Sequence, residues 1–265
     1  MRRLARDLFL VRKAFVNWPV VALAGTLWKH LPLPRSELVV KSRRGARLTV
    51  PLTREAGALY PALEIFAFSV YEAGWKLEDR PYSVDIGANV GAFTLWLRET
   101  YPGLRGICYE PDPEAFSYLE RNLKGSEIRA RNAAVAERSG TAVLSRPSPC
   151  GGTSSLGIQK ERLRGSDVQV PVVAFDEVMA KVEEPVSLVK LDCEGSEYEI
   201  VLQSRPESWQ AVRRVVIEYH PSGDVEPIAL VRRLRLLGFS LVKERQDAAG
   251  LGMYWFSRDG SLEAT

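Results

Sequence analysis

The chain has 265 residues, of which 46% are hydrophobic and 26% charged, as is ordinary for a globular protein. Its formal net charge of +3 is too small to indicate nucleic-acid binding by itself. Cys108, Cys150 and Cys193 are far apart and include no Cys-x-x-Cys pair, so neither a disulfide framework nor a zinc site is predicted. This length allows one large α/β domain with additions, or two small ones, and we expect a reducing, cytoplasmic compartment.

Residues 1–36 are predicted to form a basic, helical segment ahead of the main domain. Five apolar residues recur there at helical spacing, namely Leu4, Leu8, Val11, Phe15 and Trp18. They predict an amphipathic helix over residues 3–18, bent or restarted by Pro19. The uncharged run over 14–28 is shorter than the roughly 20 residues of a membrane span. The plain interpretation is a helix packed on the domain surface, and the alternative is peripheral contact with a membrane or a partner.

Residues 37–80 are predicted to form a hairpin and a helical lead-in. Residues 37–41 and 47–52 alternate like strands around Arg43-Arg44-Gly45, which indicates a β-hairpin with a basic turn. A helix over 63–71 then leads into the central unit.

Residues 81–258 alternate strands with helices, and residues 259–265 form a tail. Predicted strands cover residues 84–86, 106–110, 128–132, 186–192, 214–219, 239–243 and 252–257. Predicted helices cover residues 92–101, 113–123, 196–203 and 227–237. This order predicts an α/β fold with a doubly wound, mostly parallel sheet and an antiparallel last strand.

Two extra strands, at 141–144 and 168–173, flank a segment rich in proline and glycine at 145–167. We expect that segment to be a substrate-facing loop beside the cofactor crevice, since long loops in compact domains are usually functional or disordered.

The stretch Asp85-Ile86-Gly87-Ala88-Asn89-Val90-Gly91 joins the first of these strands to a helix. Gly87 permits a sharp turn, and the lack of a Cβ at Gly87 and Gly91 would let a ligand approach the backbone. The helix that follows directs N–H groups and a positive dipole end at such a ligand. Asn89 replaces the second glycine of a dinucleotide fingerprint, which disfavours NAD. Asp85 is predicted to attract a cationic cofactor group, directly or through water.

Two polar residues end the next two strands of the predicted sheet. Glu110 follows the second strand, about 20 residues after the glycine turn, where a carboxylate accepts both hydroxyls of a ribose. Asn132 ends the third strand and is expected either to cap that strand or to hydrogen-bond an adenine edge.

The densest polar cluster follows the strand at 186–192. Asp192, Glu194 and Glu197 occur within six positions, and helix capping does not account for Asp192. The next strand repeats the arrangement with Glu218 and His220. Histidine at the mouth of a sheet can act as a general base near neutral pH, although the ordinary alternative is a hydrogen-bonded histidine before a proline turn.

Together, five stretches resemble the ordered signatures of the FkbM family of S-adenosylmethionine (SAM)-dependent methyltransferases. They are Val84–Gly91, Tyr109–Asp112, Asn132–Val135, Lys190–Glu197 and Ile217–His220. The resemblance runs from about residue 37 to 256 and leaves residues 1–36 unexplained. It implies methyl transfer from SAM to an oxygen, commonly a hydroxyl of a sugar, polyketide or other natural product.

The resulting assignment divides the candidate residues between cofactor and substrate. The cofactor residues are Asp85, Gly87, Asn89, Gly91, Glu110 and Asn132. The catalytic, substrate-side residues are His220, Asp192, Glu194, Glu197 and Glu218, with His220 as the first candidate for the base. A divalent metal at this cluster is possible but not favoured. The rival functions are a dinucleotide-dependent oxidoreductase and a non-catalytic adenosyl-binding module.

Overall fold

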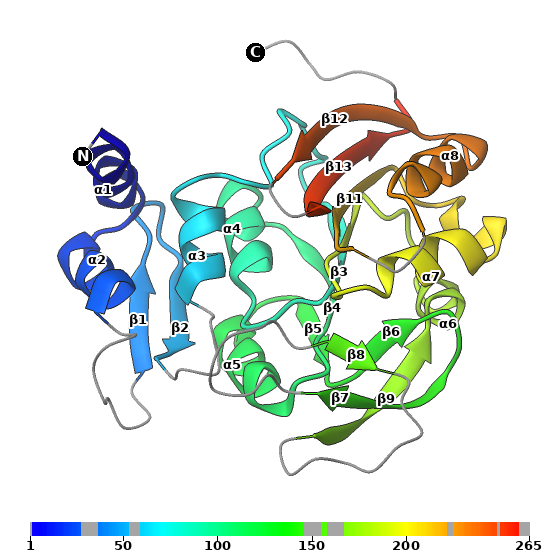
Figure 1. The fold of residues 1–265 in the computed structure, drawn as a ribbon, viewed down its shortest axis with the longest axis horizontal. Coiled ribbons are helices and arrows are strands. Elements are labelled where there is room, and N and C mark those ends of the chain that lie inside the picture. Colours follow the sequence, from blue (N-terminus) through cyan, green and yellow to red (C-terminus); the bar gives the residue numbers. More distant parts are fainter. Residues whose placement is uncertain are drawn as a thin grey trace.

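The structure is a computed structural model that describes residues 2–27, 37–52, 59–145, 155–157, 167–221, 225–247 and 250–259 (Figure 1). Its main sheet contains β3 (Tyr82–Ile86), β4 (Arg105–Tyr109), β5 (Ile128–Arg131), β10 (Leu188–Leu191), β11 (Arg214–Tyr219), β12 (Ser240–Gln246) and β13 (Gly252–Ser257). The spatial order is β12-β13-β11-β10-β3-β4-β5. The five strands from β11 to β5 are parallel, and β13 is antiparallel to both of its neighbours. The predicted mostly parallel sheet with an antiparallel last strand is confirmed.

Helices cover both faces of this sheet. They are α4 (Ala92–Thr100), α5 (Pro113–Leu123), α6 (Phe175–Ala180), α7 (Glu197–Gln203), the 3₁₀ turn Pro206–Trp209, and α8 (Ile228–Leu236). Val216 of β11 belongs to the apolar cluster that contains Phe93 of α4, whereas Val215 and Ile217 belong to the cluster that contains Leu230 of α8. Successive strand residues point to opposite faces, so β11 is buried on both sides, which explains its continuous apolar run.

A second, four-stranded sheet is inserted between β5 and β10 and lies below the main sheet in Figure 1. It contains β6 (Ala134–Ala136), β7 (Gly140–Ser145), β8 (Ser155–Gly157) and β9 (Val168–Ala174) in the order β6-β9-β7-β8. The sequence predicted β7 and β9 but neither the other two strands nor a separate sheet. Most of the predicted substrate-facing loop, 146–154 and 158–166, lies outside the described residues.

The N-terminal part consists of α1 (Arg2–Ala14), α2 (Trp18–Leu27), the hairpin β1 (Glu37–Lys41) and β2 (Arg47–Pro51), and α3 (Leu59–Phe66). The predicted long helix is therefore two helices, and Pro19 stands at the start of the second, where its missing N–H costs little. Asn17 explains the break, because its side chain donates to Val39 O at 2.7 Å and accepts from Lys41 N at 2.9 Å. The third helix lies earlier than the predicted 63–71, since the chain enters a left-handed conformation at Ser69. Among the described helices, none combines the length and apolar composition that crossing a membrane requires.

Candidate active site

A cavity of about 540 Å³ opens at the carboxyl edge of the main sheet. Gly87, Glu110, Asp192 and His220, which follow β3, β4, β10 and β11, line its wall. This volume lies within the range of small-molecule sites, which is roughly 300–1,000 Å³. Because these four strands are parallel, motifs more than a hundred residues apart meet at one edge, as the sequence predicted.

The two glycines of the turn after β3 make room for protein atoms. Gly87 has φ 78°, and a Cβ there would lie 1.7 Å from the backbone oxygen of Asp192. Gly91 has φ 88°, and its Cβ would lie 2.9 Å from Leu119 Cδ1. The turn after β3 therefore rests directly on the turn after β10. Gly87 also lines the cavity, and the close approach of a ligand to its backbone stays a prediction.

Asp85 lies below the cavity and has no exposed surface. Thr94 Oγ1 donates to Asp85 Oδ2 at 2.6 Å, and Lys190 Nζ lies 3.2 Å from Asp85 Oδ1. Lys190 Nζ also donates to Gly87 O at 2.8 Å and lies 3.2 Å from Asp192 Oδ2. Burial lowers the pKa of Lys190, but Asp192 and Asp85 outweigh it and hold that pKa above its usual value.

These contacts revise the role expected for Asp85. The carboxylate of Asp85 binds the buried ammonium of Lys190 beneath the glycine turn. Because Asp85 has no exposed surface, it cannot contact a cofactor directly, which was one of the two possibilities that the sequence suggested. Lys190 was not among the predicted site residues, although a lysine inside the otherwise apolar strand β10 was a usable signal.

Glu110 lines the cavity and is only 8% exposed. Its Oε2 accepts from Asn89 N and its Oε1 accepts from Asp112 N, both at 2.8 Å. Burial raises the pKa of Glu110 to about 7, although both backbone N–H groups act in the opposite direction. Each carboxylate oxygen keeps further lone pairs, so Glu110 can still accept hydrogen bonds from a ligand. Asn89 adopts φ 50°, which directs its N–H at this carboxylate.

Asn132 caps the ends of the neighbouring strands. Its Nδ2 donates to Glu110 O at 2.9 Å and to Pro111 O at 3.0 Å. Of the two predicted roles, the structure therefore shows the cap, with both donors of the amide bound to the backbone that carries Glu110.

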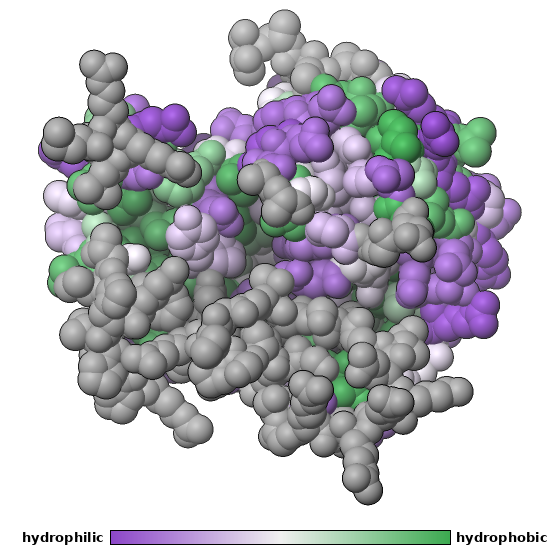
Figure 2. Space-filling model, in the orientation of Figure 1, coloured by the Kyte–Doolittle hydropathy of each residue, from purple (hydrophilic) through white to green (hydrophobic). Residues whose placement is uncertain are grey.

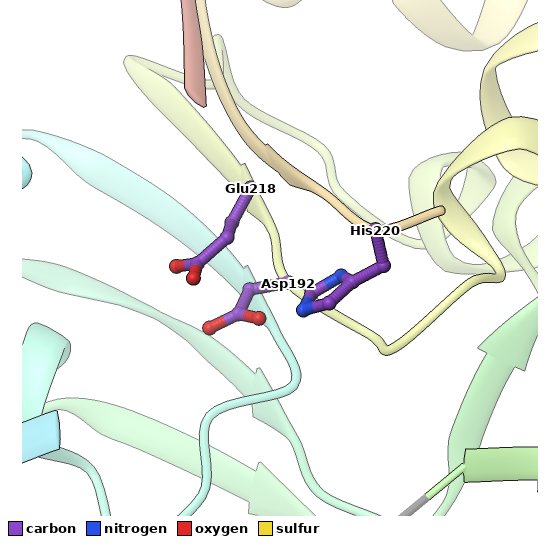
Figure 3. A group of neighbouring side chains, drawn as sticks. All are labelled: Asp192, Glu218 and His220. Atoms are coloured by element: carbon purple, nitrogen blue, oxygen red, sulfur yellow. The ribbon is translucent and has the colours of Figure 1, made fainter. Parts of the chain in front are cut away.

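Asp192, Glu218 and His220 converge on one point of the cavity wall, from β10 and β11 (Figure 3). One ligand atom from each lies within 4.8 Å of the other two. The Tyr71 hydroxyl lies 2.8 Å from Glu218 Oε2 and 3.1 Å from Asp192 Oδ2. A hydroxyl has one hydrogen to donate, so the second contact is favourable when that carboxyl is itself protonated.

The titration of Glu218 matches this arrangement. Burial, followed by the charge of Asp192, raises the pKa of Glu218 to about 7. Tyr71 comes from the segment after α3 and belongs to no motif, so no sequence pattern indicated that it lies at the site.

His220 lies between two carboxylates. Its Nδ1 is 3.2 Å from Glu197 Oε1, and its Nε2 is 3.3 Å from Glu194 Oε2. Burial lowers the pKa of His220, but the hydrogen bond and charge of Glu197, followed by the charges of Glu194 and Asp192, raise it to about 9. At neutral pH this side chain is a positively charged imidazolium, which argues against the base role expected for it.

Glu197 is fully buried and holds the turn after β10. Its Oε1 accepts from Cys193 N and its Oε2 accepts from Gly195 N, both at 2.7 Å. The catalytic role expected from the sequence is therefore corrected to positioning, because Glu197 fixes the turn and orients His220.

A divalent metal at Asp192, Glu218 and His220 would need two changes. His220 would have to lose its proton, and Asp192 would have to exchange the ammonium of Lys190 for the ion. The residues present therefore fit an ion-paired cluster better than a metal centre at neutral pH.

Known proteins resemble this chain over most of its length. The family model described as Methyltransferase FkbM domain matches residues 85–241. The chain belongs to this family. It is 27% identical over 219 residues to Methyltransferase sdnD of Sordaria araneosa, covering 70% of this chain and 83% of that relative. It is 26% identical over 243 residues to 31-O-demethyl-FK506 methyltransferase FkbM of Streptomyces tacrolimicus, covering 79% and 92%.

A solved structure of Methyltransferase FkbM from Methylobacillus flagellatus KT superposes with a TM-score of 0.48 at 15% identity. The alignment covers 90% of this chain but spans only 59% of that one. Membership of the FkbM family makes this protein a SAM-dependent methyltransferase, and the dinucleotide oxidoreductase and the non-catalytic module are set aside.

The groups that line the cavity of this FkbM-family protein suit the charges of SAM. SAM carries a sulfonium and an ammonium, and Glu110, Asp192, Glu194 and Glu218 all line the cavity. The first N–H groups of α4, which have no acceptor within the helix, lie at the same wall and suit a carboxylate.

Proposed function

We propose that this FkbM-family enzyme transfers the methyl group of SAM to a hydroxyl oxygen of a sugar, polyketide or other small natural product. The observation that carries the proposal is Glu218, a carboxylate at the cavity wall with a pKa of about 7. A general base works best when its pKa lies near the working pH, and a hydroxyl needs such a base more than a neutral amine does. The relative from Streptomyces tacrolimicus, which is named for a 31-O-demethyl substrate, supports an oxygen acceptor.

The cofactor half of the cavity is built by the turn after β3 and by Glu110. SAM supplies a methyl group on a positively charged sulfur. Glu110 would accept the ribose hydroxyls through its remaining lone pairs, while Asn89 N and Asp112 N keep its carboxylate in place. Asp85, Gly91 and Asn132 act by positioning this frame.

The acceptor half is built by Asp192, Glu218 and Tyr71. Glu218 takes the proton of the acceptor hydroxyl as the new carbon–oxygen bond replaces the methyl–sulfur bond of SAM, which leaves as its demethylated product. Asp192, held by Lys190 and Tyr71, orients that hydroxyl, since positioning accounts for much of the rate of such displacements. His220 carries a positive charge beside the carboxylates of Asp192 and Glu218, and this charge compensates part of their negative charge.

The first test is calorimetry with SAM and its demethylated product, followed by transfer of labelled methyl groups to hydroxylated natural products and to their O-methylated counterparts. We expect label on the free hydroxyls alone. A labelled nitrogen or carbon in a product whose hydroxyl stays free would contradict the proposal.

Dialysis of the enzyme against a chelator should leave turnover unchanged. A loss of turnover that only a divalent metal restores would establish the metal alternative.

The pH dependence of kcat/KM distinguishes the two candidate bases. We expect the rate to rise as pH passes about 7, where Glu218 loses its proton, and to fall above about 9, where His220 loses its charge. A rate that keeps rising through pH 9 would identify His220 as the base.

A further inference from the structure

The first two helices are fixed to the body of the protein and still expose apolar side chains. Phe15 has no exposed surface, and its ring centroid lies 6.0 Å from that of Phe66. Val16 N donates to Lys41 O at 2.8 Å, and Arg43 N donates to Ala14 O at 2.9 Å. The hairpin therefore holds α1 and α2 in one orientation.

The outward surface of these helices is unusually apolar. Leu8, Phe9, Val16 and Val20 are between 38% and 56% exposed. In the described part of the chain, most large exposed apolar side chains lie between residues 8 and 23. No residue of α2 carries a charge. Burying such a face in an apolar medium would be favourable.

Basic side chains are interleaved with these apolar ones. On α1, Lys13 Nζ lies 5.1 Å from the centroid of the Phe9 ring, one helical turn away, so the two share a face. Arg12 stands one turn after Leu8 in the same way. Over residues 6–25 and 37–52 the basic residues are Arg6, Arg12, Lys13, Lys41, Arg43, Arg44 and Arg47. All seven are exposed.

Few carboxylates oppose this charge. Those two ranges hold only Asp7 and Glu37, and Glu37 is paired with Arg121 at 2.7 Å. The chain as a whole has a net charge of only +3, so positive charge is concentrated at this end. Figure 2 shows hydrophobic and hydrophilic residues side by side at its left edge, where Figure 1 places α1, α2 and the hairpin.

We propose that the exposed face of α1 and α2, together with the basic hairpin turn, docks the enzyme onto a membrane surface of anionic phospholipids. Phe9, Val16 and Val20 would enter the boundary between headgroups and acyl chains. The surrounding arginines and lysines would contact the lipid phosphates and headgroup carboxylates, and their long side chains can reach past the apolar layer. A protein partner could also bury the apolar face. It would not require positively charged side chains all around that face, whereas an anionic membrane surface would attract every one of them.

The test is sedimentation of the full-length protein with vesicles of phosphatidylcholine alone or mixed with phosphatidylserine. We expect binding to the mixed vesicles only, and loss of that binding as salt rises, because screening weakens surface charges. Arg12→Glu with Lys13→Glu should weaken binding by about a hundredfold or more. Phe9→Ser with Val20→Ser should weaken it by about tenfold or more.

The matched control is α8, at the opposite end of the molecule in Figure 1. Leu236 there is 83% exposed and Arg235 is also exposed, so Arg235→Glu with Leu236→Ser makes the same kinds of change elsewhere. We expect this variant to bind vesicles like the unmodified protein, and all variants to bind SAM equally in solution.

Three results would overturn the proposal. They are the absence of binding to mixed vesicles, equal binding to phosphatidylcholine alone, and equal weakening by the α8 control. A concentration-dependent dimer that Phe9→Ser with Val20→Ser dissociates, without vesicle binding, would show instead that this face joins two copies of the chain.

Discussion

The two halves of the carboxyl edge use similar carboxylates in different ways. At the ends of β3 and β4, Asp85 and Glu110 bind groups of the protein's own frame, namely Thr94, Lys190 and two backbone N–H groups. At the ends of β10 and β11, Asp192, Glu218 and His220 lie close together at the cavity wall, and Tyr71 contacts the first two.

The first half therefore holds the backbone in place, and the second half carries the groups proposed for proton transfer. The first half is a frame whose polar groups fix the turn that faces the cofactor. In the second half, burial and then the charge of the neighbouring Asp192 raise the pKa of Glu218 to about 7. Burial also raises the pKa of Glu110 in the first half, but two backbone N–H groups hold that carboxylate in place. A carboxylate at the end of a strand is therefore not catalytic merely because it belongs to a sequence motif. The groups that it contacts decide whether it positions the backbone or takes part in catalysis.

The largest effect is expected from removing the base in the second half. Glu218→Gln keeps the shape and the contact with Tyr71 but cannot take a proton, so kcat should fall by about 10²–10⁴-fold. SAM affinity in calorimetry should stay within about threefold, since the change lies on the acceptor side. His220→Asn serves as the comparison, and a larger loss of kcat for that variant than for Glu218→Gln would reverse the assignment.

The next effect tests the contact between the halves. Gly87→Ala would place a Cβ 1.7 Å from Asp192 O, so at least one turn must move, and we expect unfolding free energy to fall by more than about 3 kcal/mol. Gly125 is the matched control, because its φ of 79° is nearly the same but its Cβ would meet no atom within 4 Å. Gly125→Ala should cost only about 1 kcal/mol. Equal losses in denaturant titrations would mean that backbone conformation, and not the contact, dominates.

A smaller effect separates ligand contact from frame within the first half. Glu110→Ala should weaken SAM binding by about 10–100-fold, because it removes a charged acceptor together with a buried support for the turn. Asn132→Ala removes a cap and should lower stability by about 1 kcal/mol while weakening SAM binding by less than about threefold. A loss of SAM affinity in Asn132→Ala as large as the loss in Glu110→Ala would show that Asn132 contacts the cofactor.

The last effect appears only as pH changes, and it concerns the charge of His220. Its pKa of about 9 lies above the usual 6.5, so its charged form stabilises the fold fully below pH 6.5, and this stabilisation is lost as pH rises through 9. The stability difference between the unmodified protein and His220→Asn should therefore shrink by on the order of 2 kcal/mol between pH 6 and 10. A difference that stays constant across this range would show that His220 is neutral in the folded protein.

Local pattern predicted the elements that have strong periodicity or clear ends. The helix Pro113–Leu123 and the strands Arg214–Tyr219 and Gly252–Ser257 lie where they were expected. The short β6 (Ala134–Ala136) was missed because three residues give too few positions for a periodic pattern. The break between α1 and α2 was predicted as a bend or restart at Pro19, but α1 ends earlier, at Ala14, and the break depends on the contact of Asn17 with β1, far along the chain.

The sequence by itself determined the family, the mostly parallel direction of the strands and the set of polar residues at the carboxyl edge of the sheet. Strand and helix alternation requires parallel neighbours, and parallel strands bring their carboxyl ends together. Only the tertiary structure decided which of those residues face the cavity, because burial and charge depend on side chains that no local pattern brings near. Lys190 takes Asp85 out of the site, Glu197 turns His220 into a cation, and burial together with the charge of Asp192 raises the pKa of Glu218 to about 7.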